Sequence, residues 1–142
     1  MTQLTLALAN GIIAAAIDEA RKRGTKPMGV VVLDAAGHIK AVQREDGATM
    51  FRTQIAEGKA WAAVAMGVNS RNLLKRATDN PTFFNALSNT GQGKFIPQVG
   101  AVLIQDAEGN VIGAAGASGG TGDEDEAICI HGVQQAGLSV AA

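Results

Sequence analysis

A glycine-rich stretch near the C-terminus carries the clearest chemical pattern in the sequence. It contains Ser118, Gly119, Gly120 and Thr121 and leads into a run of four acidic residues. Glycines let the chain turn its amides toward one point, and a helix start adds partial positive charge, so this stretch could hold a carboxylate or phosphate ligand. In the alternative interpretation, Thr121 or Asp123 caps the following helix, and the acidic residues complement its dipole.

A second group of charged residues lies near the middle of the chain. Arg44 and Asp46 follow a predicted strand, and Glu57 and Lys59 belong to the next predicted helix. Arginine can form two hydrogen bonds to one carboxylate, and a neighbouring lysine and acid can transfer protons. Such a group could therefore form a site for a small organic acid. Gly58 in mid-helix costs about 1 kcal/mol relative to alanine and indicates close approach by a backbone or a ligand. A solvated, salt-bridged surface is the other interpretation.

The two histidines, His38 and His131, are candidate ligands for a heme iron, because a neutral imidazole nitrogen can coordinate it. Equally, His38 follows a turn and fits an exposed position, while His131 fits a helix contact or a subunit interface. Cys129 has no catalytic partner in the sequence and is interpreted as a small buried hydrophobe. Motifs of the CxxC, HExxH and CxxCH types are absent, so the sequence indicates no metal site.

Composition and charge exclude several classes of function. The net charge is −1 and the basic residues form no stripe, which argues against a nucleic-acid partner. The apolar stretch from Leu4 to Ile17 runs into Asp18 and Glu19, so it predicts a helix and neither an export signal nor a membrane span. A single cysteine needs no oxidising compartment. We therefore expect a cytoplasmic protein without a membrane partner.

The first half of the chain predicts two helices around a β-hairpin. Apolar spacing and turn residues give, in order, a helix over Leu4–Arg23, a strand over Met28–Leu33, a turn at Asp34–Gly37, a strand over His38–Arg44 and a helix over Met50–Val68. Gly24 lies directly after the basic last turn of the first helix and ends it.

The second half predicts another hairpin and another helix. Asn69–Gly93 is rich in Asn, Ser and Gly, so we expect an irregular connection with short helical turns around Leu73–Leu74 and Phe83–Phe84. The pattern then predicts a strand over Val99–Gln105, a turn at Asp106–Gly109, a strand over Asn110–Ala115 and a helix over Gly122–Gln135.

The two halves resemble each other. Asp34–Gly37 and Asp106–Gly109 share a D-A-x-G turn between apolar strands, and a helix follows each hairpin. Either duplication or chance explains this, since the turn is a common one. The pattern predicts a single α/β (α+β) domain over residues 1–142, in which two hairpin-plus-helix halves form one antiparallel sheet covered by helices.

The same segments resemble the GlcG/HbpS-like family. The resemblance is carried by the first hairpin running into Arg44–Ala48, by the helix at Ile55–Ala60, and above all by Asp106–Thr121 followed by Asp123–Ala127. It extends over nearly the whole chain from the first helix onward. It implies a five-stranded antiparallel sheet flanked by helices, and assembly into dimers or larger homo-oligomers.

The resemblance also implies a ligand class, because the family includes heme-binding proteins. The first functional hypothesis is therefore an oligomeric small-ligand-binding protein that holds heme or another tetrapyrrole through His38 or His131. The second is a catabolic enzyme, such as a tautomerase, lyase or deaminase, acting on a small carboxylate or carbonyl compound. In it, Arg44 orients the acid, Lys59 or Asp46 moves a proton, and amides of the glycine-rich stretch stabilise an oxyanion. An accessory protein without turnover is the third.

Overall fold

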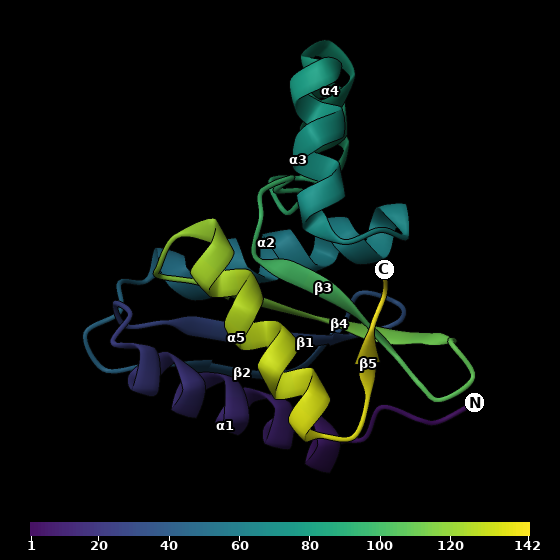
Figure 1. The fold of residues 1–142 in the computed structure, drawn as a ribbon. Helices are drawn as coiled ribbons and strands as arrows, with labels where there is room; N and C mark the ends of the chain where they lie inside the picture. Colours follow the sequence, from purple (N-terminus) through teal and green to yellow (C-terminus); the bar gives the residue numbers. More distant parts are fainter.

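The computed structural model describes residues 1–142 and contains five helices and five strands (Figure 1). The elements in chain order are α1 (Leu6–Arg23), β1 (Gly29–Asp34), β2 (Ile39–Arg44), α2 (Phe51–Met66), α3 (Ser70–Asp79), α4 (Pro81–Thr90), β3 (Ala101–Gln105), β4 (Val111–Ser118), α5 (Gly122–Gln135) and β5 (Ser139–Val140). None of the helices combines the length and apolar character needed to span a membrane.

All five strands form one antiparallel sheet in the order β2-β1-β4-β3-β5. The hairpins β1–β2 and β3–β4 meet where β1 pairs with β4, so Val31 faces Val42 on one side and Gly116 on the other. The predicted α+β fold with two hairpin-plus-helix halves is confirmed. The short strand β5 lies at the edge beside β3 and completes the five.

Helices cover both faces of the sheet (Figure 1). On one face, α1 and α5 pack against side chains that include Val30 and Val32. On the other, the small residues of α2 pack against Val31 and Leu33. Because successive residues of a strand point to opposite faces, the uninterrupted apolar run of β1 supplies two cores at once.

The helix α2 lies very close to its neighbours because it is rich in small residues. A Cβ atom on Gly58 would lie 2.5 Å from Cδ1 of Ile96 and 2.7 Å from the carbonyl oxygen of Lys94. A Cβ atom on Gly116 in β4 would overlap the carbonyl oxygen of Ala56. The close backbone approach predicted from Gly58 is therefore present, and its cause is packing of the protein against itself.

The connection after α2 differs from the prediction. Residues 69–93 were expected to be irregular with short helical turns, whereas the structure has two helices, α3 and α4, of 10 residues each. Leu73 and Phe84 are buried against Phe95, and Pro81 at the start of α4 suits the first turn of a helix. Burial of these side chains outweighs the poor helix propensity of the Asn and Ser residues around them. The two helices project from the sheet as a pair (Figure 1).

Candidate functional site

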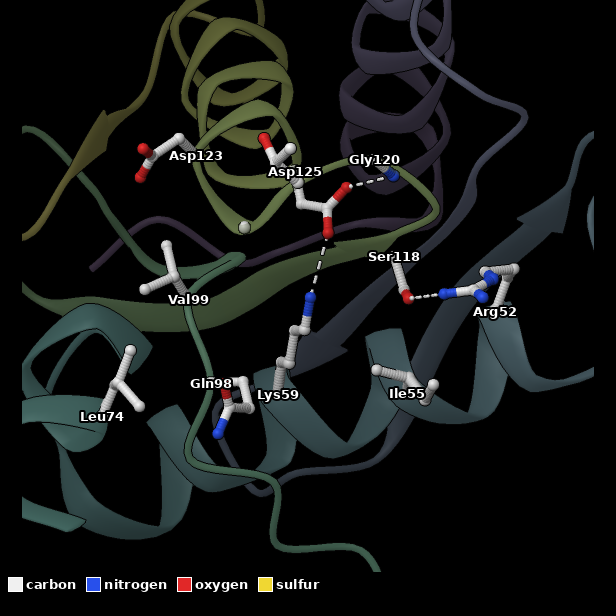
Figure 2. A pocket seen from close by; sticks show the side chains of 12 residues that line it. Arg52, Ile55, Lys59, Leu74, Gln98, Val99, Ser118, Gly120, Asp123 and Asp125 are labelled. Atoms are coloured by element: carbon white, nitrogen blue, oxygen red, sulfur yellow. Dashed lines mark hydrogen bonds and ion pairs between the residues drawn. The ribbon is translucent and has the colours of Figure 1, made fainter. Parts of the chain in front are cut away.

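A cleft of about 450 Å³ opens between α2, the end of β4 and the start of α5. Figure 2 shows the side chains that line it. The lining residues come from four stretches that are far apart in the sequence: Arg52, Ile55, Lys59, Leu74, Gln98, Val99, Ser118, Gly120, Thr121, Gly122, Asp123 and Asp125. We refer to it as the Lys59 cleft.

A buried ion pair forms the floor of the Lys59 cleft. The Nζ atom of Lys59 lies 3.0 Å from Oδ2 of Asp125 and donates a second hydrogen bond of 3.1 Å to the carbonyl oxygen of Ala117. The two side chains are 7% and 2% exposed. Figure 2 shows Lys59 rising from α2 toward the first turn of α5. A charge this deeply buried is stable only with a partner of opposite charge, and here Lys59 and Asp125 are partners for each other.

Burial has the largest effect on the pKa of the Asp125 carboxyl. Burial raises the pKa of the Asp125 carboxyl above its usual range, although the charge and hydrogen bond of Lys59 and the amide of Gly120 act to lower it. That amide donates to Oδ1 of Asp125 over 3.0 Å, so both carboxylate oxygens have partners. These hydrogen bonds hold the side chains of Lys59 and Asp125 in place at the floor of the cleft.

The amides of the glycine-rich stretch are largely satisfied within the chain. Besides the Gly120 amide, the Thr121 amide donates to Oε1 of Glu124 over 2.9 Å, and the Glu124 amide donates to Oγ1 of Thr121 over 3.2 Å. This is a reciprocal capping box at the start of α5. Of the two interpretations left open by the sequence, helix capping by Thr121 is confirmed.

The remaining acidic residues at the start of α5 also have partners. Arg71 on α3 contacts the carboxylates of both Asp123 and Glu126. Because these two carboxylates are paired and Glu124 belongs to the capping box, the acidic run does not present four free charges to the cleft. The repulsion of an anionic ligand by this run is correspondingly reduced.

Arg52 is the cation of the cleft that makes no ion pair in the chain. Its Nη1 atom donates to Oγ of Ser118 over 3.2 Å, and Ser118 is a neutral partner (Figure 2). Sequence reasoning missed Arg52. The available signal was its spacing: it lies seven residues before Lys59, and two turns of helix place both on one face.

The structure distributes the predicted site residues over several places. Lys59, Ser118, Gly120 and Thr121 line the Lys59 cleft, and Gly119 lines a small neighbouring cleft beside the same stretch. Glu57 is half-buried on α2 and lines none of the clefts.

Arg44 and Asp46 belong to a different cleft from Lys59 within the chain. They line it together with Ile17 and Arg21 of α1. The Nη1 atom of Arg44 donates to the carbonyl oxygen of Ala48 over 2.6 Å. The basic pair of the sequence hypothesis, Arg44 and Lys59, is thus not brought together, and Arg52 takes the place beside Lys59 that had been expected for Arg44.

The two histidines lie outside all four clefts. His38 is exposed in the β1–β2 hairpin. His131 on α5 is half-buried, and its Nε2 atom lies 3.7 Å from Oε1 of Glu19 on α1. Cys129 is fully buried, and burial raises the pKa of its thiol far above the ordinary value, so it is the inert apolar residue that the sequence predicted. No imidazole or thiolate therefore faces a cleft of the single chain, and these clefts do not fit a heme that needs such an axial ligand.

Comparison with known families identifies the chain. The model of the family described as haem-degrading protein HbpS-like matches residues 4–134, which is nearly the entire length. The chain belongs to the HbpS-like family. The family resemblance inferred from the hairpins and the glycine-rich stretch is therefore confirmed.

Solved structures of this HbpS-like fold agree closely with the chain. The PduOC:heme complex has a TM-score of 0.87 at 25% identity and covers 99% of this chain and 100% of its own. Protein ORFY of Klebsiella pneumoniae has a TM-score of 0.86 at 26% identity, covering 96% and 93%. HbpS has a TM-score of 0.81 at 30% identity, covering 94% and 90%. A comparison with curated protein sequences gave no significant match.

Proposed function

We propose that this chain is a small-ligand-binding protein and that the Lys59 cleft takes a ligand bearing a carboxylate. The observation that carries the proposal is Arg52, a cation in the cleft whose side-chain partner is the neutral hydroxyl of Ser118. A guanidinium presents several N–H donors in a planar fork, so a carboxylate can bind it in a bidentate manner without breaking any ion pair of the protein.

The rest of the cleft supports this ligand class. Of the four charged residues that line it, Lys59, Asp123 and Asp125 are already paired within the chain, which leaves Arg52 as the charge available to a ligand. Ile55, Leu74 and Val99 supply apolar surface for a carbon skeleton. A cleft of about 450 Å³ lies in the range of small-molecule sites.

The test is a titration with hexanoate, followed by calorimetry and by amide shifts in NMR spectra. Arg52→Gln is expected to weaken binding at least tenfold, since it removes the charged half of a charge-assisted pair. Arg44→Gln is the matched control, because it removes the same charge from a different cleft. The proposal is wrong if hexanoate produces no shifts around the cleft at millimolar concentration, or if both variants weaken binding equally.

Heme is the second candidate ligand. Its support is the PduOC:heme complex, which has the same fold over the full length of both chains. In this chain the candidate iron ligands are His131 and His38, and because neither lines a cleft, the site would have to form at a contact with a second copy. We accordingly also propose that the protein is a homo-oligomer. A cytoplasmic location is a separate proposal, which rests on the sequence alone.

A hemin titration tests this candidate independently of the carboxylate site. We expect a Soret shift that His131→Ala or His38→Ala abolishes and that Arg44→Gln leaves unchanged. Light scattering on the same samples measures whether copies associate and whether hemin changes their association. A shift that survives replacement of both histidines would exclude them as iron ligands, and the absence of any shift would exclude heme.

A further inference from the structure

Lys59 has one hydrogen-bond donor more than its partners in the chain account for. A lysine ammonium carries three N–H donors. Two are used, by Oδ2 of Asp125 and by the carbonyl oxygen of Ala117. The side chain is 7% exposed and belongs to the lining of the Lys59 cleft, and no third acceptor of the chain lies within hydrogen-bond distance of its Nζ atom.

Three side chains of α2 form a row along the cleft. Arg52, Ile55 and Lys59 lie at positions i, i+3 and i+7 of one helix and all line the cleft. The Cα atoms of the first and last are about 10.5 Å apart along an ideal helix. Their charged ends converge on neighbouring residues of β4, because Arg52 bonds to Ser118 and Lys59 bonds to Ala117. The row thus offers a free cation, an apolar surface and a hydrogen-bond donor in that order.

We propose that Lys59 donates its third N–H to an uncharged oxygen of the ligand, so that the cleft selects monocarboxylates carrying an oxo or hydroxyl group. This inference rests on the proposed function, in which Arg52 holds the carboxylate. In the bound ligand the carboxylate lies at Arg52, the carbon chain crosses Ile55, and the second oxygen lies at Lys59.

The charges of the cleft decide against a second carboxylate at Lys59. Asp125 lies 3.0 Å from Lys59 and already balances its charge, so a carboxylate at this point would meet the negative charge of Asp125 in a poorly hydrated place. An oxo or hydroxyl oxygen accepts the same hydrogen bond without that repulsion. The preferred ligand therefore has one negative charge.

The experiment uses the wild-type protein and a set of six-carbon acids, so it does not depend on the folding of any variant. Hexanoate is compared with 2-oxo-, 4-oxo-, 5-oxo- and 6-hydroxyhexanoate, and with the dicarboxylate adipate, by calorimetry. At least one oxo or hydroxy acid is expected to bind about five- to tenfold more tightly than hexanoate, the effect of one additional hydrogen bond. Adipate is expected to bind no more tightly than hexanoate.

The outcomes separate the two proposals. If none of the acids binds, the carboxylate site itself is wrong. If hexanoate binds with dependence on Arg52 but no oxo or hydroxy acid gains affinity, or if adipate binds best, only the role of Lys59 is wrong. In Lys59→Met, provided that the variant folds, the preferred acid should lose its advantage over hexanoate. An advantage that persists in Lys59→Met would overturn the inference.

Discussion

The Nζ atom of Lys59 lies 3.0 Å from Oδ2 of Asp125, although 66 residues separate them in the sequence. The contact joins α2, which covers one face of the sheet, to α5, which covers the other. The two side chains meet at the end of β4, where the carbonyl oxygen of Ala117 accepts a further bond from Lys59. One buried pair thus connects the two layers of helices at the floor of the cleft.

Replacing one residue of this pair should strongly destabilise the fold. We expect Lys59→Met to lower the free energy of unfolding by about 3–5 kcal/mol, since it leaves the charge of Asp125 buried without its counterion. Urea denaturation followed by circular dichroism measures the change.

The double variant Lys59→Met with Asp125→Leu is the control for that experiment. Because it removes both charges, it should recover a large part of the lost stability, as buried pairs replaced by apolar residues often do. A single variant within about 1 kcal/mol of wild type would mean that the pair is well hydrated in solution and not the buried contact described here.

Arg71 should influence ligand binding more than stability. Its contacts with Asp123 and Glu126 are half-exposed, so Arg71→Gln should cost less than about 1 kcal/mol of folding free energy. It leaves the carboxylate of Asp123, which lines the cleft, and that of Glu126 uncompensated, and hexanoate should therefore bind about two- to fivefold more weakly, with a smaller effect at high salt.

Lys75→Gln is the matched control for Arg71→Gln. Lys75 is exposed on the same helix, and its removal changes the net charge equally, but it makes no ion pair with the acidic residues of α5. Equal weakening in both variants would show that net charge, and not the pairing of Asp123 and Glu126, controls the affinity.

Asp106 should give the fold a dependence on acid pH. Burial acts to raise the pKa of its carboxyl, but amide donors from Thr2, Asn110 and Glu108 outweigh this and lower the pKa to about 2. A depressed folded-state pKa means that the stabilisation is complete above the ordinary value near 3.8 and is lost as the pH falls toward 2.

The corresponding measurement compares wild type with Asp106→Asn in urea between pH 6 and pH 2. The difference in stability should be constant above about pH 4 and should shrink below it. Glu108→Gln in the same turn is the control, because the Glu108 side chain is exposed. A difference between wild type and Asp106→Asn that does not change with pH would show that the charge of Asp106 is unimportant.

Much of the fold could be predicted from local patterns. The two D-A-x-G turns identified both hairpins, and in the structure Gly37 and Gly109 have the positive φ values that such turns need. The projecting α3–α4 pair could not be predicted in the same way. Its helices depend on the burial of Leu73 and Phe84 against Phe95, which is a tertiary contact that local propensity does not contain.

The candidate site could be predicted only in part, for a related reason. Lys59 and the stretch from Ser118 to Thr121 were recognisable as chemical groups, and all of these residues except Gly119 line the cleft. Sequence alone could not identify Asp125 among four consecutive acidic residues as the partner of Lys59, since that choice depends on how α5 is rotated against α2. Nor could it prefer Arg52 over Arg44, because which arginine faces the cleft depends on the packing of α2 on the sheet.

The close packing of α2 yields the last prediction, through two glycines that lie in helices. Gly58→Ala should destabilise the fold by about 1–3 kcal/mol, because the added Cβ would lie 2.5 Å from Cδ1 of Ile96 and 2.7 Å from the backbone oxygen of Lys94. Gly11→Ala in α1 is the matched change, since a Cβ there meets nothing within 4 Å, and it should stabilise by roughly 0.5–1 kcal/mol. Thermal and urea denaturation of both variants should therefore show shifts of opposite sign. Stabilisation by both would show that residues 94–96 can withdraw from α2, and the wall of the cleft formed by Gln98 and Val99 would then be free to move with them.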